Sequence, residues 1–195
     1  YLHGLGDVGL LGPDEPRYAA IGRAMASSGD WVTPRLWGEA WFEKPPLLYW
    51  LTALGQGAGL GDDLSPRVPV SLLSLGYLFL QFLILRRLDG EGVAWMATLV
   101  LATTAGWSAY SQIGVTDLPL AAMFNGCLLL GVLWMETCSR RALAGCGLCF
   151  GLALLAKGLV PLILILPLLY FAWRRWRAWW LPIAVALLVA APWYG

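Results

Sequence analysis

The sequence predicts an all-α fold, a polytopic transmembrane helical bundle with external interfacial helices in its first loop. Three observations support this class. The chain is 59% hydrophobic and only 13% charged, with a mean hydropathy of +0.67, far from the values of a soluble domain. Apolar segments recur along most of the chain after Pro66, too many for one buried core. Arginine clusters close every second segment, as alternating crossings of a membrane require.

The first 65 residues are predicted to hold the end of a first membrane segment and an external loop with two surface helices. Residues 15–27 favour the first, because Pro16 is tolerated in a first helical turn. Residues 45–60 are apolar, but the glycines at 55, 57, 59 and 61 weaken them as a spanning helix. A crossing there would also spoil the alternation of the arginine clusters, so we expect an interfacial helix. We further expect one span before Tyr1 and more protein after Gly195.

Residues 66–195 are predicted to form about six transmembrane helices. The apolar run at 142–173 is too long for one helix across a hydrocarbon core of roughly 30 Å. We therefore expect two short helices that turn at Lys157 and Gly158. The predicted segments are residues 66–86, 93–110, 118–135, 142–173 (two helices) and 178–192.

The positive-inside rule makes the arginine-rich loops cytoplasmic. Tryptophans surround the last cluster, Arg174 to Arg177, as in an interfacial aromatic belt, although a membrane-active or nucleic-acid role is an alternative for this run. A net charge of +1 gives no overall field that favours nucleic acid. The opposite loops are then external, and they collect the following charged residues: Asp14, Glu15, Arg17, Glu43, Lys44, Asp117 and Lys157.

Three cations of this external set suit a phosphate carried on a lipid. Arg17 can bind phosphate oxygens in a bidentate manner, whereas Lys44 and Lys157 act as point charges. Lys157 interrupts an apolar run, where an ionisable residue costs a few kcal/mol. The alternative for Lys157 is that it only extends to the membrane surface.

The carboxylates beside the cations suit a general base or a metal ligand. Asp14 precedes a predicted helix, so an N-cap explains it equally well. Asp117 is likewise explained as the N-cap of its span. Cys146 and Cys149 form a C-x-x-C on an apolar segment without polar surroundings, which favours a helix interface over a metal site.

Four blocks of sequence together resemble a known family. They are PDEPRYA, SGDWVTPRLWGEAWFEKPPLLYWLTAL, VTDLPL and LLAKGLVPLILILPLL, in this order. The chain resembles the polyprenyl-phosphate-sugar-dependent membrane glycosyltransferases, which include bacterial aminoarabinose transferase and the protein O-mannosyltransferases. The aminoarabinose-transferase-like branch is the more similar one by these motifs.

The resemblance implies a GT-C fold and a site on the external face. It implies transfer of a sugar from a polyprenyl-phosphate donor to a lipid, glycan or protein acceptor, without nucleic acid as a partner. The catalytic residue of the family's D-E pair corresponds to Asp14, followed by Glu15, and the acidic residue of the second external loop to Asp117. The donor-phosphate residues correspond to Arg17, Tyr18, Lys44 and Lys157.

The sequence departs from the family in three places. Trp41 stands where relatives often have tyrosine, and the segment at Lys157 has AKG in place of the frequent TKG. Glu43 corresponds to a residue that helps hold zinc in some members, but His3, the only histidine here, lies outside the motifs. Glu43 is therefore the one candidate ligand that these motifs offer for a divalent metal such as zinc.

We expect a glycosyltransferase in the inner membrane, with its site facing the periplasm and with inversion at the sugar. A transporter or flippase of a lipid-linked sugar is the alternative, since the same cations would bind its phosphate. An inactive binding or scaffold subunit is a third.

Overall fold

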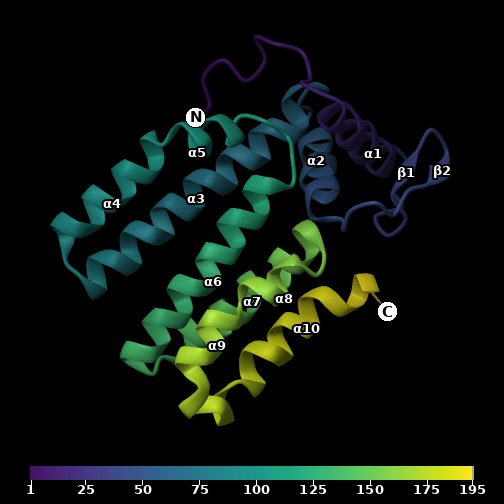
Figure 1. The fold of residues 1–195 in the computed structure, drawn as a ribbon. Coiled ribbons are helices and arrows are strands. Elements are labelled where there is room, and N and C mark those ends of the chain that lie inside the picture. Colours follow the sequence, from purple (N-terminus) through teal and green to yellow (C-terminus); the bar gives the residue numbers. More distant parts are fainter. Residues whose placement is uncertain (195) are drawn as a thin grey trace.

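Most of residues 1–194 are helical, and the strands among them form one two-stranded hairpin in the first loop (Figure 1). A computed structural model describes residues 1–194, and Gly195, where the expected second region ends, lies outside them. The first loop holds α1 (Asp14–Ser28), β1 (Arg35–Leu36), β2 (Glu39–Ala40) and α2 (Leu47–Gly57). The elements that follow are α3 (Leu64–Leu88), α4 (Glu91–Thr103), α5 (Ala105–Tyr110), α6 (Asp117–Thr137), α7 (Arg140–Lys157), α8 (Val160–Leu164), α9 (Leu166–Ala172), the 3₁₀ helix η1 (Trp173–Ala178) and α10 (Trp180–Tyr194). The all-α prediction is confirmed.

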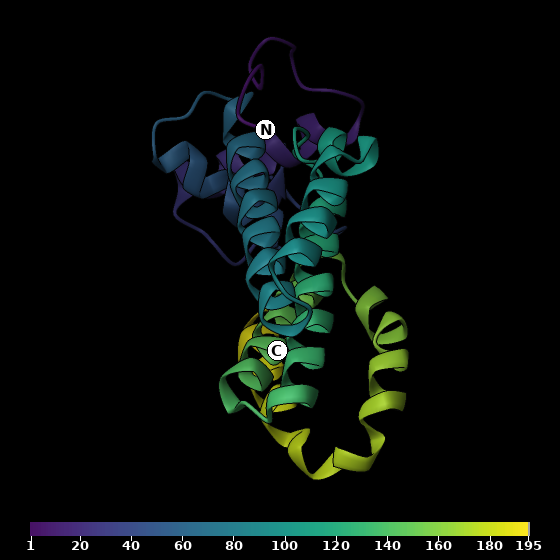
Figure 2. The same cartoon turned by 90° about the vertical axis from the view of Figure 1, so that its left-hand side faces the viewer.

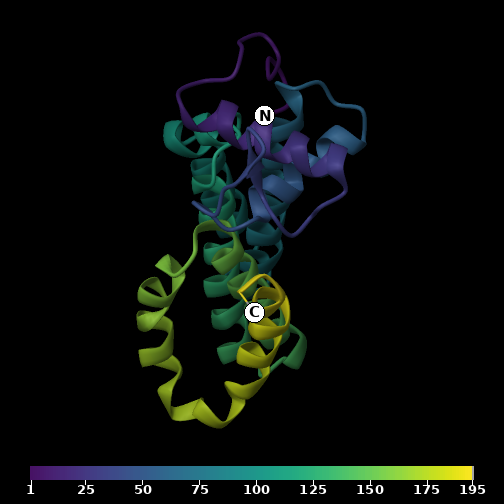
Figure 3. The same ribbon diagram turned by 90° about the vertical axis from the view of Figure 1, so that its right-hand side faces the viewer.

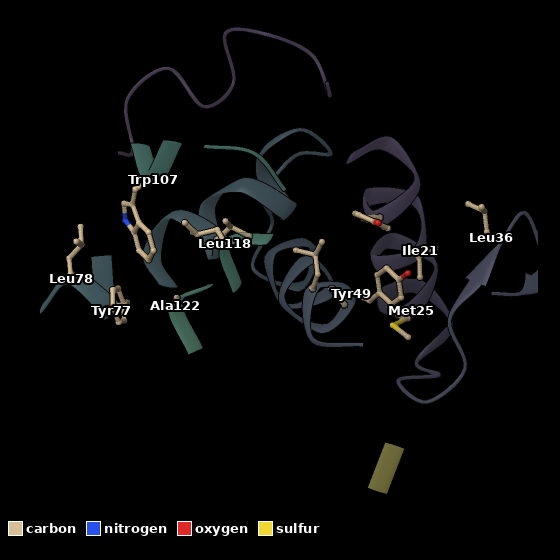
Figure 4. Packing of buried hydrophobic residues seen from close by; sticks show 13 residues of the cluster. Ile21, Met25, Leu36, Tyr49, Tyr77, Leu78, Trp107, Leu118 and Ala122 are labelled. Carbon is tan, nitrogen blue, oxygen red and sulfur yellow. The ribbon is translucent and has the colours of Figure 1, made fainter. Parts of the chain in front are cut away.

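The two helices of the first loop pack into the bundle and do not merely cover it. Their buried faces join a cluster of 13 side chains that also draws on α3, α5 and α6 (Figure 4). Ile21 and Met25 of α1 contribute to it, together with Tyr49 of α2 and Leu118 of α6, and none is more than 2% exposed. Burial of aliphatic and aromatic side chains of this size stabilises the fold by about 1.5–3 kcal/mol each. The first loop is therefore held against the end of the bundle.

Two helices are long and apolar enough to cross a membrane by length and composition. They are α3, with 25 residues, and α6, with 21 residues. At 1.5 Å per residue they extend about 37 and 31 Å, enough for a hydrocarbon core of roughly 30 Å. They cover the predicted segments 66–86 and 118–135, with ends that differ by a few residues.

The predicted segment 93–110 is interrupted, so a continuous helix there is wrong. Thr104 has extended backbone angles (φ −64°, ψ 126°) and separates α4 from α5. Its hydroxyl donates to the carbonyl of Val100 at 2.7 Å, and that of Thr103 donates to Leu99 at 2.8 Å. Such bonds from threonine to the preceding turn weaken or bend a helix, and this pair of threonines marks its end.

The predicted turn at Lys157 and Gly158 is confirmed. α7 ends at Lys157, and Gly158 has φ 69° and ψ −135°, a conformation that a side chain would strain. The chain beyond it forms α8 and α9 in place of one helix, because each begins next to a proline that cannot donate to the preceding turn.

The segment from α8 to η1 forms a bowed arm that leaves α7 at one end and returns through α10 (Figures 2 and 3). Residues 160–178 and α10 are bent by 103° and qualify together as one broken or re-entrant span. By length and composition the described residues therefore hold two or three spans. The expected division into a first loop and about six spans stays a prediction.

Cys146 and Cys149 lie at the contact of α7 with α6, as predicted from their apolar setting. Cys146 of α7 places its Sγ 3.4 Å from the Sγ of Cys127 in α6, and both thiols are buried. All four cysteines are unpaired. Cys146 and Cys149 thus serve the contact of α7 with α6, because small polarizable side chains allow close packing.

Candidate functional site

Arg17 connects the two charged motifs of the first loop. Its Nη2 donates to Asp14 Oδ1 one turn earlier, and its Nη1 lies 3.2 Å from Glu43 Oε2. The Trp41 indole donates to the same Glu43 oxygen at 3.2 Å. The hairpin of β1 and β2 makes this possible, because the Trp41 amide donates to the Pro34 carbonyl at 2.8 Å and so returns the chain towards α1. The hydrogen bond from Arg17 to Asp14 raises the pKa of the guanidinium.

Asp14 and Asp117 are not N-caps. α1 begins at Asp14 itself after Pro13, and α6 begins at Asp117 after Thr116, and neither helix has a side-chain cap. The cap explanation is therefore wrong for both residues. Both carboxylates are half exposed, at 50% for Asp14 and 51% for Asp117, so a ligand can reach them.

Glu15 is the buried anchor of the first loop. Its carboxylate is inaccessible and forms a bidentate pair with Arg67 of α3, at 2.8 Å to Nε and 2.7 Å to Nη2. It also accepts from the amides of Leu11 at 2.6 Å and Gly114 at 2.7 Å. Burial raises the pKa of Glu15, but these hydrogen bonds outweigh it and lower the pKa overall. The neighbour of Asp14 is thus fixed to α3 and to the loop before α6.

Tyr18 lies buried beneath the charged cluster. Burial raises its pKa to about 12, helped by the charges of Asp14 and Glu43. The phenol is therefore neutral at ordinary pH and is able to donate a hydrogen bond. Its ring lies 5.8 Å from that of Tyr49, whose hydroxyl is buried without a hydrogen-bond partner in residues 1–194.

The two lysines line one cavity of about 340 Å³. Lys44 comes from the first loop and Lys157 from the end of α7, and Glu43 lines the cavity with them. Lys157 Nζ lies 2.6 Å from Asp117 Oδ1, and Lys44 Nζ lies 3.5 Å from Glu43 Oε1. Both lysine side chains are about a third exposed. They are thus oriented by carboxylates and accessible to an anion.

Trp193 and Tyr194 at the end of α10 close the far side of this cavity. The Trp193 ring lies 5.9 Å from Phe42 and 6.3 Å from Trp50, and the Tyr194 hydroxyl donates to the Leu154 carbonyl at 3.1 Å. Aromatic walls beside two lysines suit a ligand that is part anion and part hydrocarbon. None of this was predicted from the sequence, where both residues lie just beyond the predicted segment 178–192.

A metal site is not assembled by the described residues. Within residues 1–194 no group of three histidine, cysteine or acidic side chains converges, and the Glu43 carboxylate already accepts from Arg17 and Trp41. Two carboxylates joined by one guanidinium do not make a zinc site. Glu43 as a metal ligand therefore stays a prediction.

Fold and site together define a helical membrane protein with a lysine-lined cavity at one end of its bundle. The model of the family Dolichyl-phosphate-mannose-protein mannosyltransferase matches residues 8–194. The chain belongs to this family, as the resemblance of its motifs implied.

Relatives of known name agree with the aminoarabinose branch. The chain is 39% identical to an undecaprenyl phosphate-alpha-4-amino-4-deoxy-L-arabinose arabinosyl transferase of Pseudomonas paraeruginosa, over 99% of this chain and 37% of the relative. A protein of the same name from Shewanella sediminis is 32% identical over the same shares. The chain thus spans 37% of the length of these relatives.

Solved structures match the same part of the chain. ArnT from Cupriavidus metallidurans, crystallised in the apo state and bound to undecaprenyl phosphate, is 32% identical, with TM-scores of 0.83 and 0.86. Each match covers 95% of this chain and 37% of ArnT. The GT-C fold is therefore confirmed, and the chain is a membrane protein.

Proposed function

We propose that the protein to which this chain belongs is a membrane glycosyltransferase with a polyprenyl-phosphate-linked sugar as donor. One observation carries the proposal: Lys44 and Lys157, from distant parts of the chain, line one cavity beside the Arg17–Glu43–Asp14 cluster. Two ammonium groups with aromatic walls suit a phosphate whose lipid continues into the bilayer. The relatives named as undecaprenyl phosphate aminoarabinose transferases support this donor class.

The residues divide into two roles. Lys44 and Lys157 bind the donor phosphate and stabilise the negative charge that develops on it as it leaves. Arg17 and the neutral Tyr18 line the same phosphate site. Asp14 accepts the proton of the acceptor hydroxyl. The acceptor oxygen then bonds to the anomeric carbon from the face opposite the phosphate, and the bond from that carbon to the phosphate oxygen breaks with its electron pair. This sequence inverts the anomeric configuration.

The site belongs on the periplasmic side of the inner membrane in this proposal. The arginines that close α3, begin α7 and fill η1 lie at the opposite end of the bundle (Figure 1), and the positive-inside rule assigns that end to the cytoplasm. The acceptor is a lipid, glycan or protein with a free hydroxyl. Labelling of Ser28→Cys and Ser139→Cys with a membrane-impermeant thiol reagent tests the orientation. Ser28→Cys should react before the inner membrane is broken, and Ser139→Cys only afterwards.

Turnover by the purified full-length protein tests the chemistry. Asp14→Asn keeps the size of the side chain but removes the base, so we expect a loss of about 10²–10⁴-fold in kcat. Lys157→Ala should raise KM for the donor about tenfold or more, because a charge-assisted hydrogen bond is lost. Asp7→Asn, an exposed acid at the same end without an ion pair in residues 1–194, is the control. Full turnover by Asp14→Asn would refute the role given to Asp14.

The same assay separates the enzyme from a flippase of lipid-linked sugars. In detergent there is no bilayer to cross, so a flippase leaves the donor intact. Release of free polyprenyl phosphate together with a glycosylated acceptor supports the transferase, and an intact donor refutes it.

A further inference from the structure

The end of the bundle remote from the cavity carries arginines without carboxylate partners. None of them forms an ion pair with any of residues 1–194, although three acidic residues, Asp89, Glu91 and Glu136, lie at this end. The arginines concerned are Arg86, Arg87, Arg140, Arg141, Arg174, Arg175 and Arg177. Sidedness alone explains why they are basic. It does not explain how three of them are arranged within one six-residue turn.

That turn is η1, and Arg175 fixes it to the end of α6. The Arg175 guanidinium donates to the Met135 carbonyl at 2.6 Å and to Cys138 Sγ at 3.6 Å. It also lies 5.7 Å from the centre of the Trp134 ring. At Arg175 the backbone leaves the helical region (φ −108°, ψ 26°). Arg175 is thus used for structure, and the turn is held in one place.

Arg174 and Arg177, on either side of this anchor, face outwards. Arg174 is exposed and makes no side-chain hydrogen bond within residues 1–194, and Arg177 lies over the Trp176 ring at 5.8 Å. Trp173, Trp176 and Trp180 are exposed as well, by 66%, 60% and 65%. The structure thus presents two exposed guanidinium groups among large indoles that residues 1–194 do not cover.

We propose that η1 is a binding site for anionic phospholipids such as phosphatidylglycerol. A guanidinium matches a phosphate oxygen pair in geometry and charge. Indole rings prefer the level of the headgroups, where the apolar ring and the N–H are both satisfied. The exposed indoles favour a lipid over a free phosphate, because a soluble anion would leave them in water. This proposal is independent of the transferase reaction.

The affinity of the protein for spin-labelled lipids tests this proposal. The full-length protein is reconstituted into phosphatidylcholine vesicles, and the association constants of labelled phosphatidylglycerol and labelled phosphatidylcholine are compared. We expect a preference for phosphatidylglycerol that falls about fivefold for each arginine removed, hence more than tenfold in Arg174→Gln/Arg177→Gln. Arg174→Lys/Arg177→Lys should retain most of the preference, since the charge remains.

The matched control is Arg23→Gln/Arg35→Gln, which removes the same charge at the other end of the bundle. It should leave the preference unchanged, and soluble glycerol phosphate should not compete with the lipid. An unchanged preference in Arg174→Gln/Arg177→Gln overturns the proposal. So does an equal loss in the control, because the effect would then be one of net charge, and so does competition by glycerol phosphate.

Discussion

Arg67→Met leaves the Glu15 carboxylate buried without its cation. In the native structure Arg67 makes two bonds to Glu15 and donates to the carbonyls of Leu5, Val8 and Gly9 at 2.6–2.9 Å. Removal of one partner from a buried ion pair costs about 3–5 kcal/mol, or about 10²–10³-fold or more in the folding equilibrium. The N-terminal residues lose their contact with α3 at the same time. We expect the largest loss of stability among single substitutions of charged residues in this chain.

Equilibrium unfolding of the full-length protein in mixed SDS micelles, followed by tryptophan fluorescence, measures this loss. The double variant Glu15→Gln/Arg67→Met should lose about 2 kcal/mol less than the sum of its single variants, because no charge is then left unpaired. Arg23→Gln is the control, since its pair with Asp62 is half exposed and is worth less than about 1 kcal/mol. A loss for Arg67→Met no larger than that of the control would refute the reasoning.

Two further predictions concern the same region. An alanine Cβ at Gly55 would lie 2.5 Å from the Ser65 carbonyl oxygen, whereas one at Gly57 would meet nothing within 4 Å. Gly55→Ala should therefore destabilise the protein by about 1–3 kcal/mol in SDS unfolding, and an equal effect of Gly57→Ala would contradict this. The pKa of Glu15 is lowered from 4.5, so its stabilising contribution is complete above pH 4.5 and is lost as the pH falls through the folded value. Thermal unfolding at a series of pH values should show this acid loss in the native chain and not in Glu15→Gln. Equal acid sensitivity of both would contradict it.

The sequence predicts the long apolar helices α3 and α6 and the turn at Lys157 and Gly158, because those features are local. A lysine followed by glycine inside a long apolar run has few explanations other than a turn at the surface. The contact of Arg17 with Glu43 is predicted less directly by the sequence. Topology placed both on one face, but the contact itself depends on the hairpin at residues 35–40.

Other parts of the site depend on distant contacts and could not be predicted. Arg67 stood at the start of an apolar segment, flanked by prolines, and nothing local indicates that it pairs with Glu15. A charged residue at the second position of a predicted span was the available signal. Trp193 reaches the cavity only because the chain bends by 103° before α10. The hydrophobic pattern of the sequence does not predict that bend.

The contacts of Glu15 also order the events of biosynthesis. Its carboxylate accepts from Leu11, four residues away, from Arg67, 52 residues away, and from Gly114, 99 residues away. Closure of such long loops is slow compared with formation of a helix. The turn that carries Asp14 therefore reaches its final geometry only after Gly114 has left the ribosome and α3 is in place. Until then the nascent first loop has an acidic motif without its cation, so the site matures only once α3 and the loop before α6 have been made.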